Sequence, residues 1–304
     1  MKKIATLLLI ALLIFSMILL ISCEQGATGP QGPQGPQGEQ GVGIEKIEIV
    51  DGKLVITYTD GKIVNLGPIV VTTGTPGLDY YLLPDGTYGV AMGTTIYLEE
   101  IEIPKYYNNV PVTQILDRAF YGAENLKCIT IPDSVTSIGS NAFDGCVNLG
   151  SIDIPDGVKI IEDGVFDGCS SLISITLPEG VTSIGSATFF NCSSLTSVTI
   201  PEGVTSIGNY AFYNCSGLTS IVIPEGVTSI GNYAFSYCSS LTSIVIPEGV
   251  TSIGTIAFSD CSSLTSITFE GTVAEWNAIE FGDWWHSDVP ATEVICSDGT
   301  VTLN

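Results

Sequence analysis

Six cysteines recur at intervals of 23 residues and form the most regular set of reactive side chains in the sequence. If they stack on adjacent coils about 4.8 Å apart, their Cα separation suits a disulfide, but parallel side chains keep the Cβ atoms wider apart than the preferred ~3.8 Å. Free thiols that act as small buried apolar groups are therefore favoured over disulfides. No histidine joins the row and paired Cys-x-x-Cys spacing is absent, so the pattern indicates no metal site. This cysteine ladder consists of Cys146, Cys169, Cys192, Cys215, Cys238 and Cys261, whereas Cys128 and Cys296 lie outside the period and have no assigned partner.

His286 is the single histidine of the chain, and it follows Trp284 and Trp285 and precedes Asp288. A serine hydrolase needs an imidazole held by an acid beside an exposed nucleophile, and nothing distinguishes one serine for that role. No catalytic residue is therefore assigned. The terminal unit of a repeat domain needs a cap over its last core layer, and Trp276, Trp284 and Trp285 suit that role. A sugar-stacking site, which requires exposed tryptophan rings, and a hydrolase in this terminal segment remain as alternatives.

A row of acidic residues also follows the repeat, with one carboxylate in each unit. Like charges stacked this closely repel one another unless water, salt or Ca²⁺ screens them. Solvation is favoured over Ca²⁺ binding, and the sequence assigns no metal and no cofactor. The row consists of Asp133, Asp156, Glu179, Glu202, Glu225 and Glu248.

These side chains must be positioned by an internal repeat, because a fixed period of 23 residues is typical of a solenoid of stacked units. In the unit that begins at Ile200, Leu-x-x-Ile-x-Ile at 218–223 and Val-Thr-Ser-Ile at 204–207 predict two short strands. Ala-Phe-x-x-Cys at 211–215 predicts a turn of α- or 3₁₀-helix. The first unit is five residues longer than the others, and its surplus at Tyr106–Val112 predicts a longer loop. The units begin at Ile103, Ile131, Ile154, Leu177, Ile200, Ile223 and Ile246.

The recurring Leu-x-x-Ile-x-Ile-Pro, Val-Thr-Ser-Ile-Gly and Ala-Phe-x-x-Cys motifs of residues 103–268 resemble the BspA-like leucine-rich repeats of bacterial surface proteins. The stretches 82–88, 272–276 and 298–301 are similar to the flanking caps of that family. The resemblance implies a mainly β leucine-rich-repeat solenoid with short helical or 3₁₀ turns. It further implies attachment to host matrix proteins or to other cells.

The outward positions of the main predicted strands carry short hydroxyls and methyl groups. Such a face has neither a base nor a charge with which to activate a nucleophile. It is compatible with an extended partner bound through many weak hydrogen bonds, and equally with plain solvated surface. The candidate binding face consists of Ser174, Thr176, Ser197, Thr199, Ser220, Val222, Ser243, Val245, Ser266 and Thr268.

The N-terminal segment has the order of a secretory signal, with Lys2 and Lys3 before an apolar run at 4–21. The run is also long enough to cross a bilayer as a permanent helix. Leu-Ile-Ser-Cys at 20–23 resembles the lipobox of bacterial lipoproteins and favours processing, with Cys23 as the lipidated first residue. The expected location is the bacterial cell envelope, with a lipid anchor in the membrane and the rest of the chain exposed at the surface.

Glycine then occupies every third position from Gly26 to Gly41, the pattern that a collagen triple helix requires. Six such triplets resemble the short collagen-like stalks of bacterial surface proteins. A homotrimer and a stiff monomeric spacer are both compatible with this segment. Residues 44–66 next alternate apolar and polar side chains around Asp51-Gly52 and Asp60-Gly61, which predicts a small three-stranded β-meander.

Composition narrows the choice of partner. The chain has nine Lys and Arg against 32 Asp and Glu, for a net charge of −23, and no basic residue follows Lys159. A nucleic-acid groove therefore has too few basic side chains, and uncharged, basic or cation-bridged partners are favoured. The 45% hydrophobic content indicates a large core rather than disorder.

Taken together, the sequence predicts a non-enzymatic, lipid-anchored surface protein that binds proteins through its repeats. A carbohydrate- or envelope-binding structural protein is the alternative. The expected organisation is a signal peptide at 1–22, lipidated Cys23 with a collagen-like spacer at 23–43, a β-meander and linker at 44–75, an N-terminal cap at 76–102, seven repeat units at 103–268 and a C-terminal cap at 269–304.

Overall fold

The computed structural model of the chain describes residues 44–50, 53–59, 61–68, 74–95 and 97–303. The predicted signal peptide, Cys23 and the collagen-like triplets lie outside these residues. The chain divides into two compact units, Met1–Ile69 and Val70–Asn304. In the described part, no helix has both the length and the apolar character needed to cross a bilayer.

The N-terminal unit contains an antiparallel sheet in the order β1-β2-β3, formed by Ile44–Val50, Lys53–Tyr58 and Ile63–Pro68. Strands β1 and β2 pair from Val50 opposite Lys53 to Ile44 opposite Tyr58. At the second turn, Gly61 has φ +79° and its N–H donates to the Tyr58 carbonyl at 2.8 Å. The predicted β-meander is confirmed.

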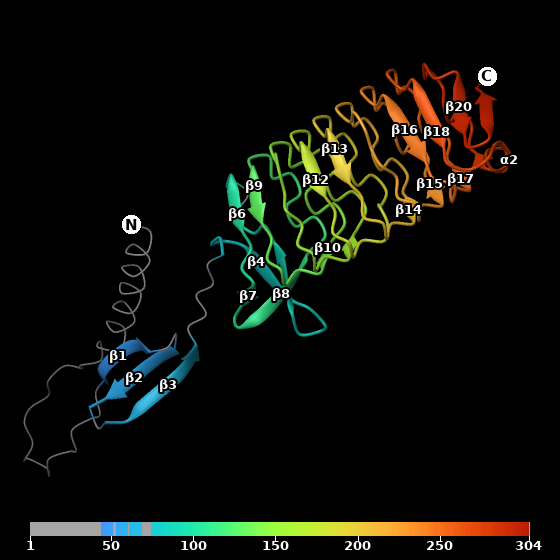
Figure 1. Cartoon of the computed structure of the whole chain (residues 1–304). Helices are drawn as coiled ribbons and strands as arrows, with labels where there is room; N and C mark the ends of the chain where they lie inside the picture. Colours follow the sequence, from blue (N-terminus) through green and yellow to red (C-terminus); the bar gives the residue numbers. More distant parts are fainter. Residues whose placement is uncertain (1–43, 51–52, 60, 69–73, 96, 304) are drawn as a thin grey trace, which may run out of the picture. The chain divides into compact units, whose positions relative to one another are not determined.

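The second unit is a solenoid in which equivalent strands of successive coils pair in parallel (Figure 1). Ser174 pairs with Ser197 and Ser243 with Ser266, so the pairing register equals the sequence period. The predicted mainly β solenoid is confirmed. The strands on this side, the main sheet, are β6 (Glu100–Glu102), β9 (Cys128–Thr130), β12 (Ser174–Thr176), β13 (Ser197–Thr199), β16 (Ser243–Ile246), β18 (Ser266–Phe269) and β20 (Glu293–Cys296).

A second ladder of parallel strands forms the next side of each coil. The threonine that precedes each of the later strands donates its hydroxyl to the equivalent carbonyl of the preceding coil, as in Thr228 to Thr205 at 3.3 Å and Thr251 to Thr228 at 3.1 Å. These hydroxyls therefore help to hold adjacent coils together. The strands are β8 (Val110–Ile115), β10 (Ser137–Ile138), β11 (Ile160–Ile161), β14 (Ser206–Ile207), β15 (Ser229–Ile230), β17 (Ser252–Ile253) and β19 (Glu280–Phe281).

The third side, which carries Ala-Phe-x-x-Cys, consists of consecutive turns. Tyr213 N–H donates to the Tyr210 carbonyl and Cys215 N–H to the Phe212 carbonyl, which is the i→i−3 spacing of a 3₁₀ turn. The N–H groups of the alternate residues, such as Phe212 and Asn214, donate instead to carbonyls of the next coil. A continuous helix cannot form because half of the donors leave the segment and because two residues per coil, Tyr210 and Asn214 in this one, have left-handed φ of 58° and 56°.

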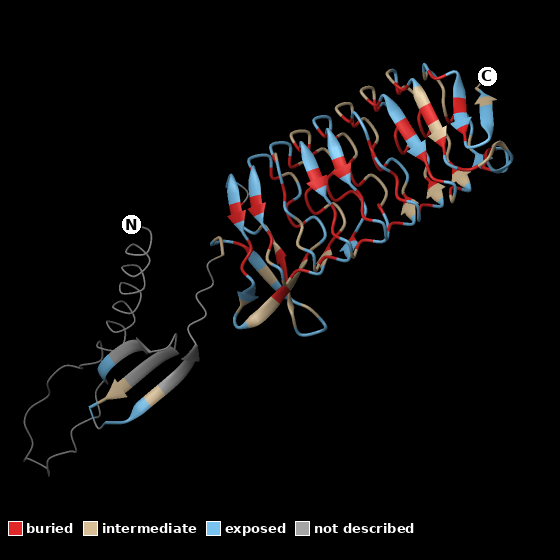
Figure 2. Ribbon diagram, viewed as in Figure 1, coloured by how far each residue is buried: buried red, intermediate tan, exposed pale blue. Residues whose placement is uncertain are grey.

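The core is a set of buried columns that run along the solenoid, to which each coil contributes an equivalent side chain (Figure 2). The column with the largest side chains is a phenylalanine ladder, in which each ring stacks on the next at centroid distances of 5.1 to 5.7 Å. All of its members are fully buried, and offset ring pairs at such distances add favourable contacts beyond the area that they bury. They are Phe120, Phe143, Phe166, Phe189, Phe212, Phe235 and Phe258.

The first end of the solenoid begins with the hairpin of β4 (Asp79–Leu82) and β5 (Tyr88–Ala91), and β5 pairs in parallel with β8. The five surplus residues predicted as a longer loop instead form a tight β-hairpin. There β7 (Tyr106–Tyr107) pairs with the start of β8, and Asn108 and Asn109 have φ of 49° and 64°. Two consecutive left-handed residues are the requirement of a type I′ turn, which asparagine tolerates well.

The C-terminal segment adds one more coil. Helix α2 (Val273–Trp276) begins with a capping box between Thr272 and Glu275, and β19 then pairs with β17. The Trp285 ring packs edge-on against Phe258, with the ring centroids 6.2 Å apart, so it covers the end of the phenylalanine ladder. Strand β20 pairs with β18, and β21 (Gly299–Thr302) closes the edge as an antiparallel strand.

Candidate binding surfaces

The main sheet presents the predicted binding face along the length of the solenoid. Its residues alternate between buried and exposed, so the Ser, Thr and Val side chains of the candidate face point outward while the intervening Ile and Val fill the core. Val222 and Val245 are 76% and 44% exposed, whereas Ser266 and Thr268 near the C-terminal end are half-buried. The face is rich in hydroxyl groups, and its outward residues from Ser174 to Thr268 carry no charge.

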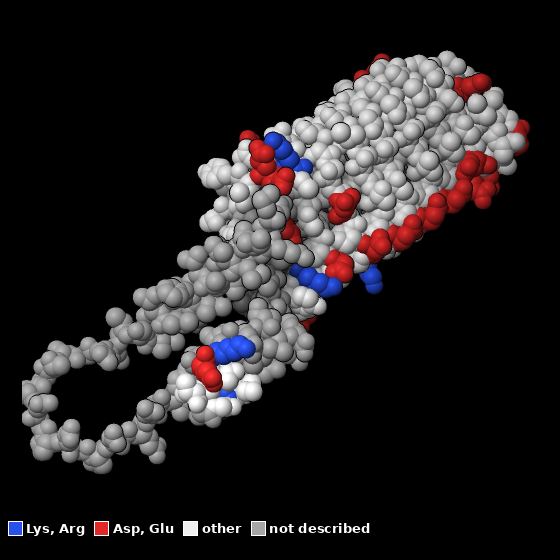
Figure 3. Space-filling view, turned by 60° about the vertical axis from the view of Figure 1, so that its left-hand side comes forward, with Lys and Arg blue, Asp and Glu red and all other residues white. Residues whose placement is uncertain are grey.

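The acidic residues line one edge of the repeat domain (Figure 3). Asp133 is held by Lys105, with Nζ 2.9 Å from Oδ1. At the other end the exposed Glu270 extends the row, and slight desolvation together with the nearby carboxylates of Glu225 and Glu248 raises its pKa. The sequence pattern missed Glu270 because it follows Phe269 directly instead of the Pro-Glu-Gly corner. Among the described residues, no group of three or more His, Cys, Asp or Glu is placed to hold a metal ion.

The cysteine ladder lies inside the core, where all six thiols are fully buried. Each Sγ donates to the carbonyl of a ladder phenylalanine in the preceding coil, at 3.0 to 3.2 Å. Burial raises the pKa of Cys146 and Cys261 to about 12, so these thiols stay protonated and weakly reactive. Every cysteine in the described residues is free; Cys128 is exposed and Cys296 is buried.

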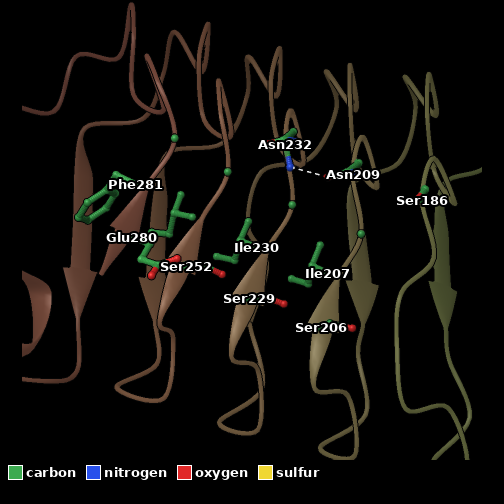
Figure 4. Close-up of a pocket in the computed structure, with 15 residues that line it drawn as sticks. Ser186, Ser206, Ile207, Asn209, Ser229, Ile230, Asn232, Ser252, Glu280 and Phe281 are labelled. Carbon is green, nitrogen blue, oxygen red and sulfur yellow. Dashed lines mark hydrogen bonds between the residues drawn. The ribbon is translucent and has the colours of Figure 1, made fainter. Parts of the chain in front are cut away.

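The second ladder carries an open groove of about 530 Å³ (Figure 4). Ser206, Ser229 and Ser252 line one side of it, and Asn209 and Asn232 line the other. The asparagines are fixed, because Asn209 Oδ1 accepts the backbone N–H of Asn232 at 2.8 Å and Asn232 Oδ1 accepts that of Thr255 at 2.8 Å. The groove ends at Glu280 and Phe281, which replace the Ser-Ile pair of the regular coils. We did not predict this groove, although the Ser-Ile-Gly-Asn spacing that builds it is present in the repeat.

The turn side is where the coils differ most from one another. Its middle coils carry a cluster of five aromatic rings, in which Phe190 stacks on Tyr213 at 4.8 Å and Tyr210 on Tyr233 at 4.7 Å. Tyr237 packs edge-on against Tyr213 at 5.5 Å and is 45% exposed. The repeat pattern concealed this cluster, because each ring occupies a position that is variable from unit to unit.

Two aspartates occupy the same variable side one coil apart. Partial burial, and secondarily the neighbouring carboxylate of Asp144, raises the pKa of Asp167 to about 6. Asp144 itself accepts a hydrogen bond from the Asn141 amide at 3.0 Å. An acid whose pKa is higher in the folded state than in the unfolded state destabilises the fold at neutral pH and ceases to do so as the pH falls.

We therefore expect Asp167→Asn to raise the free energy of unfolding at pH 7.5 by about 1 kcal/mol, a value reduced because the side chain is partly solvated. The difference from the parent protein should vanish as the pH falls from about 6 to about 4, because Asp167 is then protonated in the folded state. Urea unfolding across this range measures it. Asp153→Asn, at an exposed position, is the control; a gain that does not change with pH would contradict the assignment.

The C-terminal coil separates the three tryptophans. Trp276 and Trp285 are 3% and 8% exposed and cover the last core layer as predicted, but Trp284 is 70% exposed, so its predicted role in the cap is wrong. Trp284 stands at the left-handed position of its coil, with φ +52°, which turns its side chain away from the core. It borders a pocket of about 460 Å³ with His286, Ser287 and Asp288.

His286 lies against Trp285, with the ring centroids 4.4 Å apart, and burial lowers its pKa. Within the described residues, no hydrogen bond joins its imidazole to a serine or aspartate side chain. The geometry of a Ser-His-Asp triad is therefore not formed at this residue.

The repeat coils are similar to those of known proteins. A protein-family profile described as "BspA type Leucine rich repeat region" matches residues 92–216 and 159–283. A leucine-rich repeat protein of T. pallidum is 29% identical with a TM-score of 0.50, over 68% of this chain and 85% of that one. A comparison with curated proteins gave no match.

Two further solved structures are less similar in shape. A leucine-rich cell surface protein from Faecalibacterium prausnitzii is 27% identical with a TM-score of 0.49, over 74% of this chain and 76% of that one. A leucine-rich repeat protein from Bacteroides ovatus is 25% identical with a TM-score of 0.42, over 74% of this chain and 70% of that one.

Proposed function

Because this chain belongs to the BspA-type leucine-rich repeat family, we propose that it is a non-enzymatic binding protein of the bacterial cell surface. Its solenoid attaches the cell to proteins of a host matrix or of other cells. Cys23 carries the lipid anchor, and the collagen-like segment holds the solenoid away from the membrane, either as a monomeric spacer or as a homotrimeric stalk.

The exposed face of the main sheet is the single observation that carries this proposal. From Ser174 to Thr268 it offers short hydroxyls and the methyl groups of Val222 and Val245 on a rigid scaffold. A partner that lies along it loses little free energy to desolvation, because the face carries no charge that must be stripped of water. Side chains as short as serine and valine also lose little conformational entropy when a partner orders them. A large area and many weak contacts then give the affinity.

The anchor and the spacer are supported by the order of the segments. A charged and then apolar N-terminus leads directly into the lipobox-like Leu-Ile-Ser-Cys at 20–23. Acyl chains contribute about 0.8 kcal/mol for each buried methylene, so several chains on one cysteine hold a protein stably on a membrane. The glycine-repeat segment that follows lies between the anchor and the repeats, where a stalk is needed.

Binding of the purified protein to immobilised fibronectin, laminin and fibrinogen tests the proposal. The double variant Val222→Lys with Val245→Lys places two bulky charges in the centre of the face, where the two valines pair across adjacent strands. We expect its affinity for a matrix protein that binds the parent to fall by about tenfold or more, because lysine must be desolvated at the contact.

The matched control is Ser194→Lys with Ser262→Lys, which adds the same charge at exposed turn positions away from the face. Equal losses in both double variants would show that charge alone, rather than this face, governs binding. If none of the three matrix proteins binds the parent protein, attachment to host matrix is refuted.

A further inference from the structure

The pocket in the C-terminal coil combines one exposed aromatic ring with several hydrogen-bonding side chains. Its volume of about 460 Å³ is in the range of small-molecule sites. Its polar lining consists of His286, Ser287, Asp288 and Thr292, and its apolar lining includes Val289, Ala291 and Leu303. The buried Trp285 also lines the pocket, so the pocket adjoins the packed end of the core.

Trp284 is more exposed than the large side chains at the equivalent position of the preceding coils. The equivalent left-handed residues of the five preceding coils are Gly164, Ala187, Tyr210, Tyr233 and Ile256. Tyr210 is 38% exposed and Tyr233 and Ile256 are half-buried, whereas Trp284 is 70% exposed. Trp285 fills the core at this level and packs edge-on against Phe258 at 6.2 Å. Trp284 therefore leaves a large apolar ring in water, at a position where a non-glycine backbone is disfavoured.

The groups around this ring are mostly neutral. Burial lowers the pKa of His286, so its imidazole is uncharged at neutral pH and both donates and accepts hydrogen bonds. Ser287 and Thr292 add hydroxyls, and Asp288 adds one carboxylate. No lysine or arginine occurs after Lys159, so the pocket has no cation of its own chain nearby in sequence to attract an anion.

We propose that this pocket binds a neutral carbohydrate, with one face of a sugar ring stacked on Trp284 and its hydroxyl groups bonded to the polar rim. A pyranose has an apolar face of C–H groups and an edge of hydroxyls, which matches an exposed indole beside donors and acceptors. The site is separate from the main-sheet face and does not depend on protein binding there.

Other ligand classes fit the pocket less well. Anionic sugars would meet Asp288 without any compensating cation. A basic peptide could place a cation over Trp284, but only one carboxylate lines the pocket, and the remaining polar groups are neutral. The rim is therefore better matched to hydroxyl groups than to a guanidinium or an ammonium.

The test uses the purified full-length protein with maltotetraose, cellotetraose, mannotetraose and tetra-N-acetylchitotetraose at millimolar concentration. We expect at least one of them to shift the tryptophan emission to the blue as Trp284 is covered, and to show saturable binding in ligand-observed NMR. Tetragalacturonate should not bind, because it is anionic.

The decisive variant is Trp284→Gly, which removes the ring and suits the left-handed backbone better than tryptophan does. It should weaken sugar binding by about tenfold or more, since truncated aromatic anchors cost this much at binding sites. Tyr97→Ala, which removes another exposed ring, 81% exposed, should leave binding unchanged. The proposal is overturned if none of the neutral sugars binds, if Trp284→Gly binds as well as the parent, or if a hexa-arginine peptide binds at Trp284 while the sugars do not.

Discussion

Phe189→Ala is expected to lower the free energy of unfolding by about 4 kcal/mol. Phe189 is fully buried, and its ring stacks on Phe166 at 5.5 Å and on Phe212 at 5.2 Å. Removal of the ring takes away its own burial and leaves a cavity between two coils that are tied to their neighbours by backbone hydrogen bonds. Because each coil contacts only the adjacent ones, the lost contacts cannot be replaced from elsewhere in the molecule.

The adjacent residue provides the control for this prediction. Phe190 is half-buried on the outside of the same turn and stacks on Tyr213. Phe190→Ala should cost about 1 kcal/mol, because the side chain keeps part of its surface in water and leaves no closed cavity. Urea unfolding followed by circular dichroism measures both. Similar losses for the two variants would refute the ladder as the main source of stability.

The second large effect is expected from Gly231→Ala, which should cost about 3 kcal/mol through overpacking. A Cβ on Gly231 would lie 2.6 Å from the backbone N of Asn209 and 2.6 Å from the backbone C of Gly208. Both contacts are with the main chain of the preceding coil, so no side-chain rotation relieves them. The spacing of the coils, fixed by the hydrogen bond from Gly231 N–H to the Ile207 carbonyl at 2.8 Å, must increase.

In one coil the corresponding hydrogen bond to the preceding coil is longer. Glu162 occupies the position equivalent to Gly231, and its N–H lies 3.1 Å from the Ile138 carbonyl instead of 2.8 Å. The matched control is Gly203→Ala, whose Cβ would meet its nearest neighbours at an ordinary 3.5 Å and 3.6 Å. Gly203→Ala should be neutral or stabilising, because alanine restricts the unfolded chain. If thermal unfolding finds Gly231→Ala no less stable than Gly203→Ala, close packing of adjacent coils is not the reason that position 231 requires glycine.

The architecture was predictable because the period and the apolar pattern act at every level of the stack. Leu218, Ile221 and Ile223 recur in equivalent places, and a face that is apolar in every unit can be buried only by its copies above and below. The same reasoning located the exposed positions of the main sheet, because side chains alternate along a strand. It also predicted the small N-terminal meander from its two Asp-Gly turns.

The turn side was harder to predict because its conformation depends on adjacent coils. Ala-Phe-x-x-Cys reads locally as a helical turn, but every second N–H, such as that of Phe212, bonds to the next coil. The five extra residues of the first unit were predicted to form a loop, whereas Tyr106–Tyr107 pairs as a strand with β8. In both cases the hydrogen-bond partner belongs to a different part of the chain.

The sequence by itself determined the solenoid, its register and the composition of its outer faces, because a repeated apolar pattern has one way to bury itself. Only the tertiary structure decided which residues share a surface at the ends and on the turn side. It buried Trp285 but exposed Trp284 beside a pocket, extended the acidic row to Glu270 and raised the pKa of Asp167. These outcomes depend on contacts between particular side chains of different coils, which the period alone does not encode.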